Sequence, residues 1–65
     1  MTRVRIKEAR TTRVKTAFEA DVDPMDTTAC VRLLEREVAA RRLGPPDRWT
    51  IQAWHQRRGW IEHRP

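Results

Sequence analysis

The sequence predicts a small α+β domain of β-β-α-β-β order, in which a four-stranded antiparallel sheet carries one helix on one face. Three observations predict this fold class. Apolar and polar residues alternate near both ends of the chain, a helical periodicity occupies the middle, and Gly44-Pro45-Pro46 separates the helix from the last strands. A chain of 65 residues has room for a single domain of this kind.

Residues 2–22 predict a β-hairpin. Apolar or small residues alternate with charged residues within 2–8 and 13–22, which is typical of strands that bury one face, and the residues between them are polar. The expected core positions are Val4, Ile6, Val14, Thr16, Phe18, Ala20 and Val22. The hairpin therefore has one apolar face and one charged face.

The requirement that both apolar sets share a face restricts the register of this hairpin. The favoured register sets Arg3 opposite Glu19, which is favourable for their charges. It also sets Lys7 opposite Lys15, which lowers stability unless an anion lies nearby.

Residues 24–43 predict one amphipathic helix. Asp23 is expected to cap its N-terminus with Pro24 in the first turn, and Gly44 followed by two prolines is expected to end it. The expected apolar stripe is Thr27, Cys30, Val31, Leu34 and Val38, with Leu33 to one side. Glu37 can pair with Arg41 one turn later. The sheet residues expected beneath the helix are Val4, Ile6, Val14, Phe18, Ile51 and Ile61.

Residues 49–64 predict a second hairpin, joined to the helix by the linker 44–46. A three-residue loop at 57–59, closed by glycine in the left-handed region, sets Gln56 opposite Trp60. The residues expected on the helix side are Trp49, Ile51, Ala53, His55, Ile61 and His63. Trp54 is expected on the open side as a diagonal neighbour of Trp60.

A resemblance offers a helical alternative for this segment. The stretch "EVAARRLGPPDRWTIQAWHQRRGWI" resembles the helix-turn-helix of excisionases and mercury-resistance-type regulators, through Glu37-Val38-Ala39, Leu43-Gly44 and Thr50-Ile51-Gln52-Ala53-Trp54. The resemblance implies a DNA-recognition helix over 48–58. Three one-residue shifts and the paired prolines depart from the family pattern, and the clean alternation of Trp, Thr and Ile favours strands.

Composition restricts the class of protein and its location. No apolar run reaches the length of a membrane span, and the first residues lack the continuous apolar stretch of a secretory signal. The single cysteine, Cys30, favours a reducing, cytoplasmic setting. Because so short a chain buries little core, a homo-oligomer, most simply a dimer, is expected.

The sequence offers no motif for catalysis. It has no serine and only two glycines, so serine nucleophiles and glycine-rich phosphate loops are excluded. His55, Glu62 and His63 do not make up the ligand set of a zinc site, and the position of Cys30 in the helix stripe indicates a core residue. No enzyme activity, metal or cofactor is therefore expected.

The net charge of +5 favours an acidic partner such as nucleic acid. Twelve arginines against two lysines, with no serine, asparagine or tyrosine, indicate a GC-rich bacterial genome or one of its phages or plasmids. Basic residues can follow a phosphate backbone, and exposed tryptophans can stack on bases. The candidate binding residues are Arg3, Arg5, Lys7, Arg13, Lys15, Trp54, Arg57, Arg58 and Trp60.

The leading functional hypothesis is a non-enzymatic module that binds nucleic acid through the cationic, tryptophan-bearing sheet face, as an accessory protein of a phage or plasmid. The first alternative is a protein-binding inhibitor or adaptor that uses Trp54, Trp60 and Arg57 as anchors. The second is the helix-turn-helix regulator of excisionase type. DNA, RNA and protein partners are not separated by the sequence.

Overall fold

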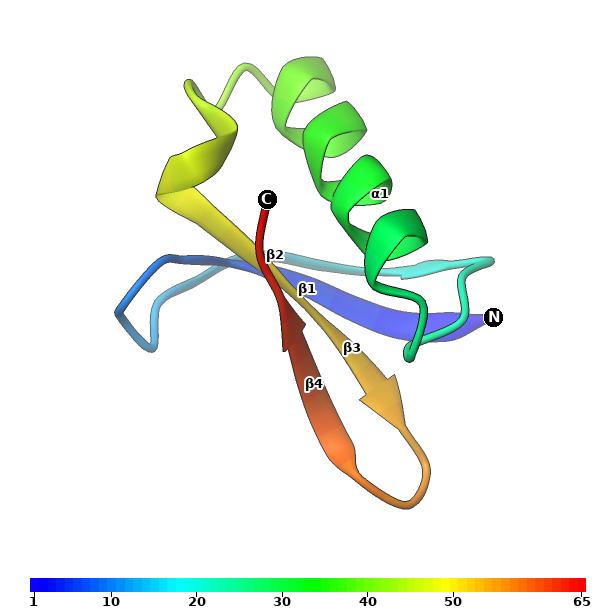
Figure 1. The fold of residues 1–65 in the computed structure, drawn as a ribbon. Coiled ribbons are helices and arrows are strands. Elements are labelled where there is room, and N and C mark those ends of the chain that lie inside the picture. The colour runs from blue at the N-terminus through cyan, green and yellow to red at the C-terminus, as the bar shows by residue number, and fades with distance from the viewer.

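The computed structural model describes all 65 residues and confirms the predicted fold class: a four-stranded antiparallel sheet with one α-helix on one face (Figure 1). The elements in chain order are β1 (Thr2–Glu8), β2 (Val14–Ala20), α1 (Thr27–Ala40), a 3-10 turn (Pro46–Arg48), β3 (Trp49–His55) and β4 (Gly59–His63). No helix in this fold has the length and apolar character that a membrane crossing needs.

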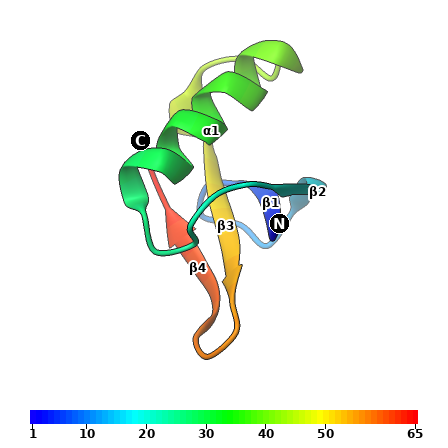
Figure 2. The ribbon, with the colours of Figure 1, turned by 90° about the vertical axis from the view of Figure 1, so that its right-hand side faces the viewer.

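The strands lie in the order β2-β1-β3-β4, so the two central strands are β1 and β3. The helix connects the edge strand β2 to β3, and β1 lies between these two strands. Figures 1 and 2 show that α1 covers one face of the sheet, while the turn between β3 and β4 projects beyond the helix. The face opposite α1 carries no second layer.

The core lies between α1 and the two central strands. Its buried residues are Val4, Ile6, Cys30, Leu33, Leu34, Val38, Trp49, Ile51 and Ala53. Phe18, Ala20, Val22 and Leu43 pack against this cluster from its margin. Leu33 is buried and Thr27 is exposed, so the helix is rotated slightly from the predicted orientation.

The register of the first hairpin is confirmed at one end and wrong at the other. Arg3 is opposite Glu19, as predicted. Between Ile6 and Lys7 the register shifts, so that Lys7 is opposite Val14 and not opposite Lys15. This β-bulge adds one residue to β2, which separates the two lysines and turns the side chain of Val14 out of the core. Val14 is 44% exposed, although it was expected to lie beneath the helix.

The helix begins at Thr27, three residues later than predicted, and Asp26 is its cap. The Asp26 carboxylate accepts a hydrogen bond from the backbone N–H of Ala29 at 3.0 Å. Asp23 instead accepts from the N–H of Met25 within a turn. The carbonyl of Pro24, which would bond within a helix that began there, accepts a hydrogen bond from His63.

The helix ends in a left-handed turn at Arg42 and not at Gly44. The N–H of Leu43 donates to the carbonyl of Val38 at 3.0 Å, and the N–H of Arg42 donates to the carbonyl of Ala39 at 3.3 Å. This is the Schellman arrangement, which requires a positive φ at the residue after the cap. Arg42 has that conformation, with φ of 54°, although glycine adopts it at lower cost.

The segment from Trp49 to His63 is a hairpin, so the helix predicted by the resemblance over 48–58 is not formed. The predicted register is wrong by two residues, since Trp60 is directly opposite Trp54 and not Gln56, and His55 is opposite Gly59. The His55 side chain explains the shift. Its Nδ1 accepts hydrogen bonds from two loop N–H groups, those of Arg57 and Arg58, at 3.1 and 3.3 Å.

His63 is buried on the helix side of the sheet, where the alternation placed it. One ring nitrogen lies 2.8 Å from the Pro24 carbonyl and the other lies 3.2 Å from the Thr27 hydroxyl. These contacts join the last strand to the start of the helix. Both nitrogens are thereby satisfied, as burial of a polar ring requires.

Candidate nucleic-acid interface

The face of the sheet opposite α1 is built by the alternation of three strands. Residues that point away from the helix come from β1, β3 and β4, and they form a patch across the middle of the sheet. These residues are Arg3, Arg5, Gln52, Trp54, Trp60 and Glu62. Since no helix covers this face, its side chains are available to a partner.

Trp54 and Trp60 form the aromatic part of this patch. They are directly opposed on β3 and β4, and their ring centroids lie 5.4 Å apart with the planes at 72°. Such an edge-to-face contact is favourable between aromatic rings. Trp54 is 38% exposed and Trp60 is half-buried. The pair is thus partly structural, yet it remains open to solvent.

Two arginines from β1 lie over these rings. The guanidinium carbon of Arg3 is 5.8 Å from the centroid of Trp54 and 5.6 Å from that of Trp60. The guanidinium carbon of Arg5 is 3.9 Å from the centroid of Trp60. Cation–π contacts hold the guanidinium groups against the rings and leave their N–H groups directed at the surroundings. We call these four residues the Arg–Trp surface.

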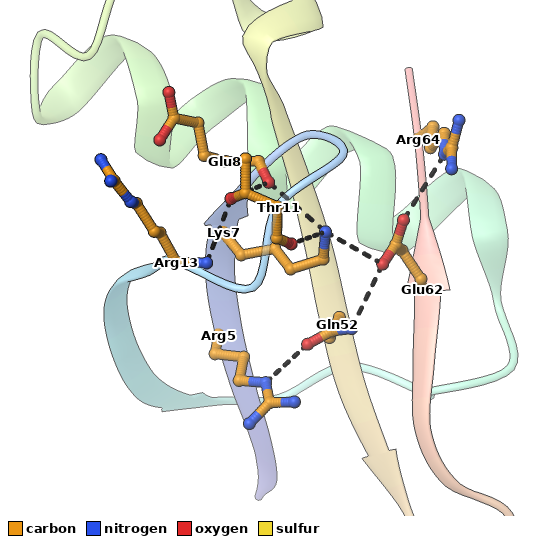
Figure 3. A network of polar contacts seen from close by, with 8 residues as sticks. All are labelled: Arg5, Lys7, Glu8, Thr11, Arg13, Gln52, Glu62 and Arg64. Carbon is orange, nitrogen blue, oxygen red and sulfur yellow. Dashed lines mark hydrogen bonds and ion pairs between the residues drawn. The ribbon is translucent and has the colours of Figure 1, made fainter.

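A polar chain fixes Arg5 from the side (Figure 3). Its Nε donates to Gln52 Oε1 at 2.6 Å, and Gln52 Nε2 donates to Glu62 Oε1 at 3.2 Å. Arg64 lies 3.5 Å from the other carboxylate oxygen of Glu62. Neither Nη atom of Arg5 takes part in this chain, so the end of the guanidinium remains free to donate.

Lys7 does not belong to an exposed basic stripe, which corrects the prediction for this residue. It is only 8% exposed. Its Nζ donates to the carbonyl of Thr11 at 2.8 Å and lies 3.4 Å from Glu62 Oε1 (Figure 3). The loop between β1 and β2 thereby folds over this end of the face. Lys7 stabilises that loop and is unavailable to a ligand.

Most of the positive charge on this chain is without a carboxylate partner. The four ion pairs of the structure involve Lys7, Arg36, Arg41 and Arg64 as cations. The remaining ten of the fourteen lysines and arginines have no carboxylate within 4.0 Å. Both arginines of the Arg–Trp surface belong to this unpaired set.

Arg57 and Arg58 lie in the projecting turn between β3 and β4, and both are exposed. Arg57 shares a surface hollow with Arg3 and Trp54 at that end of the sheet. Arg57 therefore extends the Arg–Trp surface along the hairpin, whereas Arg58 lies in the turn outside this hollow.

Two predicted binding residues, Arg13 and Lys15, lie away from the Arg–Trp surface. They border a hollow near the end of β1, together with Arg42 and Arg48, which were not among the predicted binding residues. We call these four residues the basic hollow. The signal for the missed residues was the stretch "RRLGPPDR", in which arginines flank the linker on both sides.

The remaining chemically versatile side chains have structural surroundings. Cys30 is fully buried. Burial raises the pKa of the Cys30 thiol, and the carboxylates of Asp26 and Asp23 raise this pKa further. A protonated buried thiol is a poor nucleophile. No group of three His, Cys, Asp or Glu side chains is arranged to hold a metal ion.

No protein-family model, curated protein or solved structure matches this chain.

Proposed function

We propose that this chain is a non-enzymatic module that binds single-stranded nucleic acid through the Arg–Trp surface. The observation that carries the proposal is the position of the Arg3 and Arg5 guanidinium groups over Trp54 and Trp60, on the uncovered face of the sheet. Phosphate-binding and base-stacking groups are thus combined in one patch.

The electrostatic part of the proposal rests on Arg3 and Arg5. Neither has a carboxylate partner, and the planar guanidinium group can donate two hydrogen bonds to one phosphate. The rings beneath restrict the motion of both groups, so less conformational entropy is lost when a phosphate binds. The net charge of +5 attracts a polyanion over a longer range.

The aromatic part rests on the exposed portion of Trp54. Unpaired bases stack on such rings with about 1–3 kcal/mol per base, and they do so for any base type. Bases within a duplex already stack on one another, so they cannot use an exposed ring in this way. The combination of rings and free guanidinium groups therefore favours single strands over duplex.

A fluorescence-anisotropy titration of a labelled oligothymidylate tests this proposal. Arg5→Gln and Trp54→Ala should each weaken binding about tenfold, because each removes one principal contact. Arg32→Gln is the matched control, since Arg32 is exposed and unpaired but lies on α1, across the sheet from the Arg–Trp surface. The control should bind like the wild type.

A labelled duplex of equal length provides the second arm. We expect the duplex to bind more weakly than the single strand at equal ionic strength. Equal loss of affinity in Arg32→Gln and Arg5→Gln would contradict a localised surface. Failure of both nucleic acids to bind would leave a protein partner, anchored by Trp54, Trp60 and Arg57, as the remaining hypothesis.

A further inference from the structure

The basic hollow is a second concentration of positive charge, separate from the Arg–Trp surface. Arg13, Lys15, Arg42 and Arg48 surround a depression of about 520 Å³, with Trp49 among its lining residues and Glu8 as its single acid. Glu8 and Arg3 stand five positions apart on β1, which corresponds to roughly 17 Å. Arg5, the nearer arginine of the Arg–Trp surface, is three positions from Glu8, or roughly 10 Å, so the basic hollow lies beyond that surface toward the end of β1.

The four cations of the hollow lack internal partners. None of them has a carboxylate within 4.0 Å, and Glu8 forms no ion pair with any of them. Their side chains donate no hydrogen bond to the rest of the protein. Arg48 has one further contact, with its guanidinium carbon 6.0 Å from the centroid of Trp49. Four like charges around one depression repel one another, and a bound anion would relieve that repulsion.

Two irregularities of the backbone bring these side chains together. The β-bulge in β2 inserts one residue opposite Lys7 and so changes the direction of the chain at Lys15. The left-handed conformation of Arg42, with φ of 54°, occupies a position where glycine costs less. The bulge residue Lys15 and the left-handed residue Arg42 both line the same depression.

We infer that the basic hollow is a phosphate-binding site. Arginine guanidinium groups form paired hydrogen bonds with phosphate oxygens, and the hollow combines three of them with one lysine. The phosphate can belong to a nucleic-acid backbone or to a small phosphorylated molecule. A phosphate site in the basic hollow does not depend on the proposed function. A nucleic-acid strand that binds the Arg–Trp surface can nevertheless reach the hollow as a second contact.

The three tryptophan indole N–H signals in an NMR spectrum provide separate local reporters. Trp49 borders the basic hollow and donates its indole N–H to the carbonyl of Leu43 at 3.0 Å, while Trp54 and Trp60 report the other site. Titration with inorganic phosphate should shift the Trp49 signal at a lower phosphate concentration than the Trp54 and Trp60 signals, because four cations surround the hollow and only two guanidinium groups lie over the other rings. Sodium chloride at equal ionic strength should not reproduce the shift.

Two variants and one control locate the binding. Arg42→Gln and Arg48→Gln should each weaken phosphate binding about tenfold, through the loss of charge-assisted hydrogen bonds. Arg32→Gln removes the same charge from an exposed, unpaired arginine on α1 and should bind phosphate like the wild type. Equal weakening in all three variants, or a Trp49 shift that chloride reproduces, would overturn the inference.

Titration with a short oligothymidylate distinguishes the two sources of phosphate. Shifts at Trp49 and Trp54 together would assign the hollow to the nucleic-acid backbone. A shift with inorganic phosphate at Trp49 alone, with no response to the oligonucleotide, would keep the phosphate site and reject the proposed function. Oligonucleotide shifts at Trp54 and Trp60 without any phosphate response at Trp49 would keep the proposed function and reject the phosphate site.

Discussion

Arg5 lies over the ring of Trp60, with its guanidinium carbon 3.9 Å from the ring centroid, although β1 and β4 are not neighbours in the sheet. The side chain reaches across β3, where Gln52 accepts a hydrogen bond from its Nε. The Arg–Trp surface is therefore assembled by three strands. The surface forms only when the two hairpins have paired with each other, so it exists only in the completely folded protein.

Trp49 on β3 and Trp60 on β4 have different roles, which mutation should separate. Trp49→Ala should lower the free energy of unfolding by roughly 3–5 kcal/mol, because Trp49 is 8% exposed and packs in the core. Trp60→Ala should cost only about 1–2 kcal/mol, mainly through the lost contact with Trp54. Urea denaturation measures both values. Equal losses would show that Trp60 is a core residue and not part of a binding surface.

Lys7 should prove structural and not ligand-binding. Lys7→Met should lower the free energy of unfolding by about 1–2 kcal/mol, since the Thr11 carbonyl loses its buried donor. Lys15→Met is the matched control, because Lys15 is exposed and unpaired, and its stability should change by less than about 0.5 kcal/mol. Oligothymidylate binding by folded Lys7→Met should equal that of the wild type after correction for one unit of charge. A larger binding loss than in Arg5→Gln would contradict this assignment.

Arg42→Gly should stabilise the fold while weakening phosphate binding. Glycine removes the cost of the left-handed conformation at this position, and the gain should reach about 1 kcal/mol in a thermal or urea melt. Gly44→Ala provides the opposite change, because Gly44 also has a positive φ, of 92°, and alanine there should destabilise. A destabilised Arg42→Gly would mean that the arginine side chain contributes to folding.

The buried thiol of Cys30 should make stability depend on alkaline pH. Because its pKa is raised in the folded protein, the unfolded chain ionises first as the pH rises. The stabilisation is therefore complete below the ordinary thiol pKa of about 8.5 and declines above it. Urea denaturation across this range should show a steeper decline for the wild type than for Cys30→Ala. Identical profiles would indicate that the thiol is accessible in the native state.

Periodicity predicted the elements of this fold better than their ends. The alternation of Val4 and Ile6, and of Ile51 and Ala53, identified both central strands and the face that meets the helix. Alternation does not reveal an inserted residue, so the bulge at Lys15 and the exposure of Val14 were missed. The oligomeric state remains a prediction.

The register of the second hairpin and the start of the helix depend on side-chain hydrogen bonds that a pattern does not contain. The ring of His55 organises the loop and shifts it by one residue. His63 binds the carbonyl of Pro24, so the helix begins at Thr27. Both effects need contacts that form only in the folded chain.

Strand alternation predicted one part of the candidate site and not the other. Trp54 and Trp60 fall on one face by strand alternation alone, together with Arg3 and Arg5. The basic hollow instead joins Arg13 to Arg48, which come from different hairpins. Their proximity depends on the strand order, and the strand order was not part of the prediction.

The salt dependence of oligothymidylate binding tests the central claim most directly. The slope of log Kobs against log salt concentration counts the phosphates that the protein neutralises. Arg3→Gln and Arg5→Gln should each reduce that slope by about 0.7, the contribution of one phosphate contact on a single strand. Trp54→Ala should lower the affinity at every salt concentration and leave the slope unchanged. Unchanged slopes in both arginine variants, or a binding constant insensitive to salt in the wild type, would contradict nucleic-acid binding by the Arg–Trp surface.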